Sequence, residues 1–196
     1  MAEDERVEPR SLDEWRAWLT EHHTRPRGVW LVTWRTGTSG PQIGYEQTVE
    51  QALCFGWIDS TARRLDDERR MLWFAPRKKG SGWARTNKAR IERLTAAGLM
   101  TPAGTALIDA AKADGSWTLL DDVEDLVVPD DLAAALAARP PAAEHWAAFP
   151  PSARRALLGW IVMAKRPETR AKRIAETAAA AAENRRANEW TPKERT

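Results

Sequence analysis

The sequence predicts an α+β fold, in which a three-stranded antiparallel sheet is covered by helices and followed by a C-terminal helical subdomain. Three short segments before residue 80 are rich in β-branched and aromatic side chains and are bounded by turn residues, as strands are. The other segments repeat their apolar residues at helical spacing, and proline pairs divide the second half of the chain. With 196 residues, 43% of them hydrophobic and 30% charged, the chain can bury one substantial core or two small ones.

The first predicted helix covers residues 11–23. Ser11 followed by Glu14 is typical of a capping box, in which these side chains bond the free backbone N–H groups at a helix start. Apolar residues then recur at helical spacing. We expect the helix to end before Pro26, because proline disfavours the helical conformation in the residue ahead of it.

The predicted sheet consists of three strands over residues 28–35, 57–65 and 71–76. A short helix over residues 45–56 separates the first strand from the other two, which are joined by a charged turn. Strand side chains alternate between the two faces of a sheet. Strict alternation in the second strand predicts one face with Trp57, Asp59, Thr61 and Arg63 and an opposite face with Ile58, Ser60, Ala62 and Arg64.

A further helix is predicted over residues 83–98. Pro76 ends the strand before it, and the glycine-containing turn at residues 80–82 offers Ser81 or a neighbour as a cap. Helical spacing predicts a buried stripe of Trp83, Asn87, Ile91 and Leu94. An asparagine on such a stripe needs hydrogen-bond partners, which are either the backbone of the adjacent strand or a ligand.

The second half of the chain is predicted to be helical almost throughout. Its helices are expected to begin near Thr101, Asp130, Ser152 and Pro167. We expect an α+β region over residues 1–114, an acidic connecting segment over 115–130, a helical subdomain over 131–187 and a frayed tail over 188–196.

Charge is distributed in blocks, although the formal net charge is only +2. Residues 63–93 contain eleven Lys and Arg against four Asp and Glu, whereas residues 109–144 contain two against nine. Basic residues again dominate residues 151–186. Two interpretations stay open: the blocks neutralise one another across the fold, or a basic block forms an anion-binding face.

The sequence lacks the usual signatures of catalysis and metal binding. It has three histidines, a single cysteine at Cys54, and none of the common nucleotide-binding, hydrolase or metalloprotease motifs. We therefore expect no metal site and no cofactor, and the catalytic residues stay unknown. Asp59 and Glu46 are the candidates for a catalytic base, because carboxylates near tryptophans can have raised pKa values. An acidic N-terminus and the absence of a long apolar run predict a cytoplasmic protein without membrane insertion.

The best-motivated binding site lies around the cationic run Arg77, Lys78 and Lys79. Backbone N–H groups at the following helix start attract anions, and the nearby glycines allow a ligand to approach closely. Eleven tryptophans are first of all candidates for the core, yet some could form walls of a pocket. The predicted ligand-binding residues are Trp57, Asp59, Trp73, Arg77, Lys78, Lys79, Trp83 and Asn87.

Three functions remain open from the residues alone. The first is binding of a small aromatic or anionic molecule, and the second is an enzyme that uses a carboxylate base on such a ligand. The third is nucleic-acid binding through the basic blocks, although no convincing helix-turn-helix pattern is present. No sequence pattern described above predicts the oligomeric state.

Three segments carry a family resemblance: GWIDS, FAPRKKGSGWARTNKARIERLTAAGLMTPAG and FPPSARRALLGWIVMAKRPETRAKRI. Together they resemble the bacterial YdeI/OmpD-associated family, also called bacteriocin-protection proteins, over about residues 10–187. The resemblance implies a cytosolic α+β protein with a part in stress response or in tolerance of antimicrobial compounds such as antibiotics. Under the binding hypothesis above, the protein would sequester such a compound. It supplies no catalytic residues, so the predicted site depends on physical argument alone.

Overall fold

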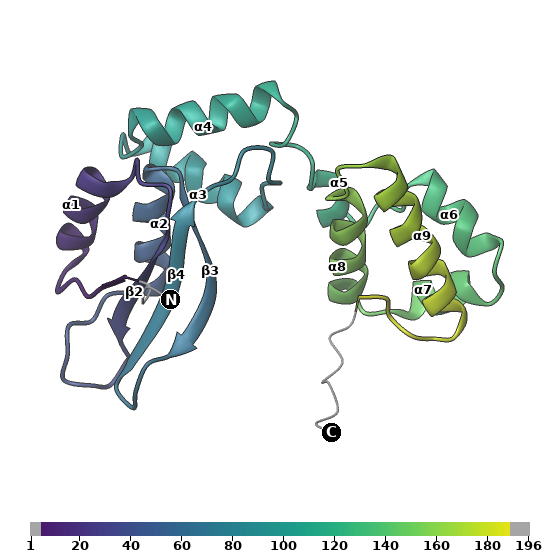
Figure 1. The fold of residues 1–196 in the computed structure, drawn as a ribbon, viewed down its shortest axis with the longest axis horizontal. Coiled ribbons are helices and arrows are strands. Elements are labelled where there is room, and N and C mark those ends of the chain that lie inside the picture. Colours follow the sequence, from purple (N-terminus) through teal and green to yellow (C-terminus); the bar gives the residue numbers. More distant parts are fainter. Residues whose placement is uncertain (1–4, 189–196) are drawn as a thin grey trace. The chain divides into compact units, whose positions relative to one another are not determined.

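The structure is a computed structural model that describes residues 5–188 and consists of two compact units (Figure 1). Of the described residues, 5–81 and 86–115 form the first unit, and 82–85 and 116–188 form the second. The predicted tail lies outside the described residues except for residue 188. Within the described chain, no helix is long and apolar enough to cross a membrane.

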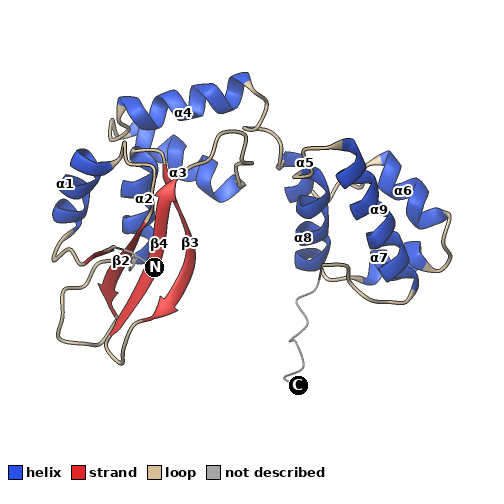
Figure 2. Ribbon diagram, in the orientation of Figure 1, coloured by secondary structure: helices blue, strands red, loops and turns tan. Residues whose placement is uncertain are grey.

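The first unit contains a mixed four-stranded sheet with the order β1-β2-β4-β3. Figure 2 shows the three longer strands side by side in the order β2, β4, β3. The strands are β1 (Arg6–Val7), β2 (Val29–Trp34), β3 (Trp57–Arg64) and β4 (Arg69–Pro76). The α+β class and the three antiparallel strands are confirmed, but the predicted strand number is wrong because β1 pairs parallel to β2. A strand of two residues is too short to show the alternating pattern by which strands are predicted.

Four helices accompany this sheet: α1 (Leu12–His22), α2 (Tyr45–Cys54), α3 (Arg85–Ala96) and α4 (Pro102–Ala113). Ser11 caps α1 as predicted, and its hydroxyl accepts a hydrogen bond from the backbone N–H of Glu14 at 3.1 Å. Helix α1 packs on the sheet through Trp15, whose ring lies 5.4 Å from that of Phe74 on β4. The core on this face is fully buried and includes Trp15, Leu19, Val29, Leu31 and Phe74.

Strand β3 contains a bulge that changes which side chains share a face. Asp59 pairs with Phe74, but the next pair joins Ala62 to Leu72, so β3 has one residue more than β4 between these pairs. The predicted strict alternation is therefore wrong beyond Asp59. Ala62 and Arg64 lie on the face of Asp59, because each extra residue reverses the side-chain pattern that follows it.

The predicted helix start at Trp83 is also wrong, since α3 begins only at Arg85. Residues 82–85 pack within the second unit, where a Cβ on Gly82 would come within 2.6 Å of Leu120. The ring of Trp83 lies 5.2 Å from that of Trp117. These contacts hold Trp83 outside the helix that carries Asn87. Ser81 caps no helix, because α3 begins only at Arg85; its hydroxyl donates to the carbonyl oxygen of Lys78 at 2.7 Å.

The second unit is a helical bundle. Its helices are α5 (Asp121–Glu124), α6 (Asp130–Ala137), α7 (Ala142–Ala148), α8 (Pro151–Val162) and α9 (Pro167–Ala182). The large side chains of its core are Val123, Leu132, Leu136, Trp146, Phe149, Leu157, Leu158, Ile161 and Ile174. Helix α9 adds buried alanines, whose small side chains let neighbouring helices approach it closely.

Candidate functional site

The three tryptophans of the predicted pocket lie in three different environments. Trp57 is a core residue, only 1% exposed, and its indole N–H donates to the carbonyl oxygen of His23 at 2.9 Å. Trp73 is half-buried on the opposite face of the sheet, where its ring meets that of Trp30 edge-on at 5.2 Å. Trp83 is buried within the second unit. Trp57 and Trp73 therefore cannot wall one common pocket on the sheet.

The predicted cations also differ in their surroundings. One terminal nitrogen of Arg77 donates to the carbonyl oxygen of Ser81 at 3.4 Å, and burial lowers the pKa of its guanidinium to about 10. Arg77 is thus still charged at neutral pH. Lys78 and Lys79 are exposed to solvent. Of the three predicted cations, only Arg77 is held in a defined position by a packed environment.

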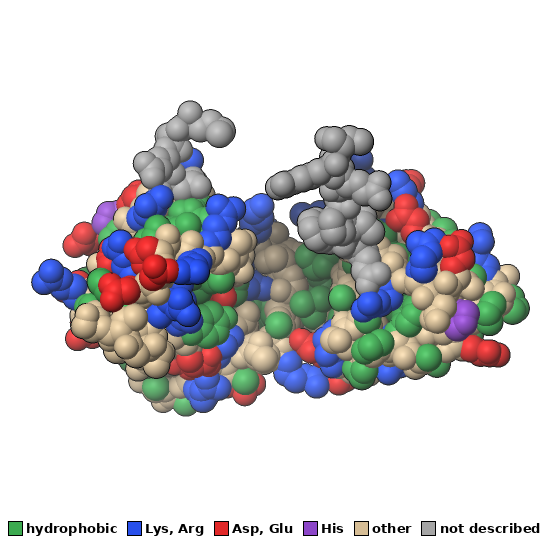
Figure 3. All heavy atoms as spheres, turned by 90° about the horizontal axis from the view of Figure 1, so that it is seen from below, with side chains coloured by type: hydrophobic (Ala, Val, Ile, Leu, Met, Phe, Trp, Pro, Cys, Tyr) green, Lys and Arg blue, Asp and Glu red, His purple; other side chains and the backbone are tan. Residues whose placement is uncertain are grey.

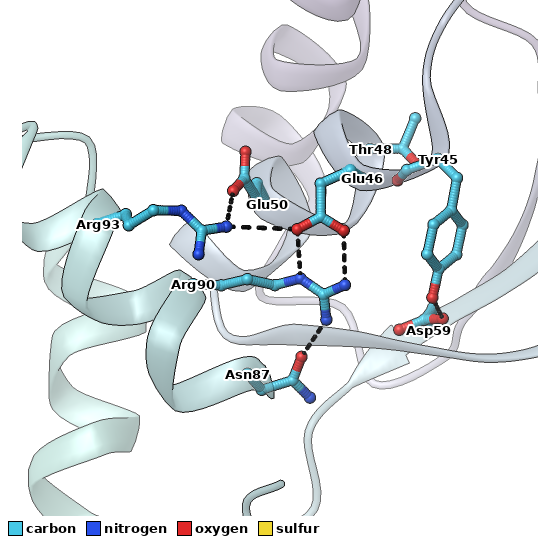
Figure 4. Close-up of polar contacts among 8 residues, drawn as sticks. All are labelled: Tyr45, Glu46, Thr48, Glu50, Asp59, Asn87, Arg90 and Arg93. Atoms are coloured by element: carbon cyan, nitrogen blue, oxygen red, sulfur yellow. Dashed lines mark hydrogen bonds and ion pairs between the residues drawn. The ribbon is translucent and has the colours of Figure 1, made fainter. Parts of the chain in front are cut away.

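Asp59 is joined to a residue that the sequence did not single out. The Tyr45 hydroxyl, which extends from the start of α2, donates to a carboxylate oxygen of Asp59 at 2.9 Å (Figure 4). Burial and this hydrogen bond raise the pKa of Tyr45, so the phenol stays protonated and keeps donating. The tyrosine remains 45% exposed. Asp59 therefore has one occupied oxygen on a surface that solvent and solutes can reach.

Glu46 and Asn87 belong to one ion-pair network that joins α2 to α3 (Figure 4). The Arg90 guanidinium donates to both Glu46 oxygens at 2.9 and 2.6 Å and to the Asn87 side-chain oxygen at 2.7 Å. Arg93 bridges Glu46 and Glu50. The sequence predicted that Asn87 bonds either the backbone of the adjacent strand or a ligand. In the structure its side-chain oxygen accepts a hydrogen bond from Arg90 instead. This network holds two helices together.

The hydrogen bonds from Arg90 lower the pKa of Glu46, which makes Glu46 a poor catalytic base. A carboxyl group with a lowered folded-state pKa stabilises the fold above its unfolded pKa, near 4.5, and this stabilisation disappears as the pH falls through the folded value. We expect Glu46→Gln to be less stable at neutral pH and to lose less of its stability on acidification than the wild type. Urea unfolding at neutral pH and at about pH 3 measures this.

The control for this experiment is Glu21→Gln on α1. Glu21 is exposed, and its carboxylate has no hydrogen bond or ion pair among the described residues. Its replacement is expected to leave the pH dependence of unfolding as in the wild type. If Glu46→Gln and Glu21→Gln gave the same pH profile, the network around Arg90 would contribute nothing to stability.

A second polar feature of the first unit is a hollow of about 380 Å³ lined by Arg35, Ala62, Arg63, Arg64 and Arg70, which we call the arginine hollow. The arginine hollow lies near the turn between β3 and β4. Figure 3 shows this end of the first unit, where Lys and Arg side chains lie beside Asp and Glu side chains. Arg64 and Arg70 are direct cross-strand partners, so they share a face. Arg63 lines the hollow, but its guanidinium stacks over Trp30 at 4.9 Å on the other face.

The charges of the arginine hollow are only partly balanced. Arg64 forms an ion pair with Asp67, whose carbonyl oxygen also accepts a hydrogen bond from Arg35 at 3.2 Å. Among the hydrogen bonds of the described residues, the Arg70 side chain donates only to the hydroxyl of Thr33, at 3.4 Å. Among residues 5–188, neither Arg35 nor Arg70 has a carboxylate within ion-pair distance. Like charges directly opposite in a sheet destabilise it, so this arrangement favours an anion.

Arg63, Arg64 and Arg70 belong to the basic block over residues 63–93, but the sequence pattern did not predict that they form a site. The turn between the two predicted strands could have suggested that Arg64 lies opposite Arg70. Arg35 lies outside the basic block, and only the pairing of β2 with β4 brings it to the same end of the sheet. Within the described chain, no group of three or more His, Cys, Asp or Glu is placed to hold a metal ion.

Two family models match the chain. The model described as a domain of unknown function (DUF8412) matches residues 7–107, which is most of the first unit. The model described as bacteriocin-protection, YdeI or OmpD-associated matches residues 125–184 in the second unit. Comparison with curated proteins and with solved structures finds no match.

Proposed function

Because the chain belongs to the DUF8412 domain family and carries a bacteriocin-protection domain of the YdeI or OmpD-associated type, we propose that it is a protection protein that binds a small anionic molecule. The second match is consistent with a role in stress or protection. The anion would lie in the arginine hollow of the first unit. This proposal keeps the ligand class expected from the sequence and changes the residues that bind it.

The observation that carries the proposal is the direct pairing of Arg64 with Arg70 across β3 and β4. Arg64 already pairs with Asp67, so a phosphate or carboxylate in the hollow would mainly balance Arg70, which has no carboxylate partner among residues 5–188. Guanidinium is suited to two parallel hydrogen bonds with such groups. Arg35 adds a third cation at the same hollow. The volume of about 380 Å³ is within the range of small-molecule sites, roughly 300 to 1,000 Å³.

Binding fits this geometry better than catalysis does. The hollow is lined by arginine and alanine side chains, and arginine stays protonated at any physiological pH. The two carboxylates considered as bases lie elsewhere: Glu46 is neutralised by Arg90, and Asp59 accepts from Tyr45. Asp59 remains the base to test if turnover of a ligand is ever observed, since removal of a catalytic base abolishes turnover while binding survives.

Titration calorimetry with phenyl phosphate tests the proposal. We expect the wild type to bind it and Arg70→Gln to bind at least about tenfold more weakly, because a hydrogen bond to a charged group contributes about 1.5–3 kcal/mol. Without ligand, Arg70→Gln is expected to be more stable than the wild type by about 0.2–1 kcal/mol, since it removes the like-charge pair. If Arg70→Gln bound phenyl phosphate more weakly but was more stable than the wild type, Arg70 would be a ligand-binding residue and not a residue that stabilises the fold.

The matched control is Lys79→Gln, which removes one positive charge from the predicted cationic run of the first unit. It is expected to leave the affinity for phenyl phosphate within a factor of about two, because an exposed lysine contributes little to binding at a distance in salt. If Lys79→Gln weakened binding and Arg70→Gln did not, the site would be the cationic run before α3. Equal binding by wild type and both variants would refute both locations.

Nucleic acid is the alternative ligand, because a phosphate group of its backbone could also bind in the arginine hollow. The small hollow predicts few phosphate contacts, and therefore a shallow dependence of affinity on salt. A single-stranded oligonucleotide that binds more tightly than phenyl phosphate, with affinity falling steeply as salt rises, would identify the protein as a nucleic-acid binder instead.

A further inference from the structure

The second unit contains an apolar pocket of about 230 Å³ that is separate from the arginine hollow. Its lining comes from α5, the segment that follows it, α8 and α9. The apolar side chains are those of Val123, Val127, Pro129, Leu158, Ile161 and Val162. An engineered apolar cavity of about 150 Å³ accommodates benzene, so this pocket has room for an aromatic ring with a short chain.

The rim of this pocket is formed by a strained turn at the end of α5. The backbone N–H of Leu126 donates to Val123 and that of Val127 donates to Asp122, at 3.2 and 2.8 Å. This bonding pattern is a Schellman motif, whose left-handed position is usually glycine. Here Leu126 occupies it with φ 59°, which costs about 1–2 kcal/mol for a residue with a side chain. Such strain is concentrated at ligand-binding segments.

The same turn leaves an apolar side chain exposed at the pocket. Val127 lines the pocket and is 50% exposed, so the pocket is open to solvent at this side chain. A ligand in the pocket would cover part of this surface. The strained turn and the exposed valine together indicate a site that is completed by an apolar group.

Two charged residues at the pocket determine which ligand charge fits. Arg170 is neutralised, because its guanidinium donates to both carboxylate oxygens of Asp131, at 2.8 and 2.9 Å. Asp122 is exposed, and its carboxylate has no hydrogen bond or ion pair within residues 5–188. The unbalanced charge at the pocket is therefore negative. A positive group on the ligand would find a partner in Asp122 without displacing an existing ion pair.

We propose that this pocket binds a small amphiphilic cation, with an aromatic or aliphatic body among the valine, leucine and isoleucine side chains and an ammonium group beside Asp122. This site is independent of the anion site, so either can fail without the other. It gives the two units ligands of opposite charge. The ligand class follows from the pocket volume, the apolar lining and the Asp122 carboxylate, which is unpaired among residues 5–188.

Methyl NMR on the full chain tests the pocket with 2-phenylethylamine and with 2-phenylethanol, which has the same size and no charge. The amine is expected to shift the methyl signals of Val123, Val127 and Leu158 and to bind about three- to fivefold more tightly than the alcohol, as for a partly exposed ion pair. If saturating amine left these methyl signals in place, the pocket would be a packing gap and the proposal would fail.

A charge-matched pair of variants tests the role of Asp122. Asp122→Asn is expected to lower the affinity for the amine to that for the alcohol and to leave the alcohol unaffected. Asp130→Asn removes the same charge from the start of α6, outside the pocket lining, and is expected to change neither affinity. Equal weakening by both variants would show only a general charge effect and would overturn the assignment of Asp122.

Discussion

Replacing Trp57 by alanine is expected to lower the free energy of unfolding by about 3–5 kcal/mol, the usual cost of removing a buried tryptophan side chain. Trp57 is 1% exposed, meets Trp18 edge-on with ring centroids 5.8 Å apart, and donates to the backbone of His23. The alanine variant would open a cavity and leave the His23 carbonyl oxygen without this donor. Urea unfolding followed by circular dichroism measures the loss.

Trp57→Phe is the control, because phenylalanine fills most of the volume but lacks the indole N–H. It is expected to cost about 1–2 kcal/mol, as for a lost buried hydrogen bond with slight loss of packing. Phenyl phosphate binding by the folded fraction is expected to be unchanged in both variants. If Trp57→Ala remained stable but no longer bound phenyl phosphate, Trp57 would be part of the binding site, as the sequence predicted.

Gly104→Ala is expected to destabilise the protein by about 1–3 kcal/mol, as in other overpacked sites, although alanine is normally favoured over glycine in helices by about 1 kcal/mol. Gly104 lies in the first turn of α4, against the end of α2. A Cβ there would approach the backbone oxygen of Cys54 to 2.3 Å. That oxygen already accepts hydrogen bonds from Thr101 and has little freedom to move.

The matched control is Gly159→Ala in α8, the other helical glycine with a defined contact. A Cβ there would lie 3.8 Å from the nearest side-chain atom, on Val123, which is an ordinary contact. This variant is expected to gain about 0.5–1 kcal/mol from helix propensity. Thermal unfolding of both variants measures the contrast. A gain in stability for both variants would show that propensity, and not the close approach of α4 to α2, decides stability.

The elements that the sequence predicted well are those whose signals are local. The helix over residues 11–23, the three longer strands and the Ser11 cap are decided by neighbours a few residues away, and the structure contains all of them. Strand β1 was missed because only its parallel pairing with β2 defines it. The start of α3 was misplaced because Trp83 packs on Trp117, which is distant in the sequence.

The candidate site was harder to predict than the fold. Asp59 and Asn87 were identified as polar residues in need of partners, and both have partners in the structure, but these are Tyr45 and Arg90. The arginine hollow depends on the bulge after Asp59, which turns Arg64 to the face of Asp59. No period in the sequence reveals a bulge, since it is an interruption of the period.

By itself, the sequence determined the α+β class, most helices and strands, and the division of charge into basic and acidic blocks. Spacing and capping patterns act within a few residues, so they can be read from one chain. Only the tertiary structure decided which cations meet at the turn between β3 and β4, and that an apolar pocket of the second unit lies beside the carboxylate of Asp122. Those contacts depend on strand register and helix packing, which join residues that local patterns do not connect.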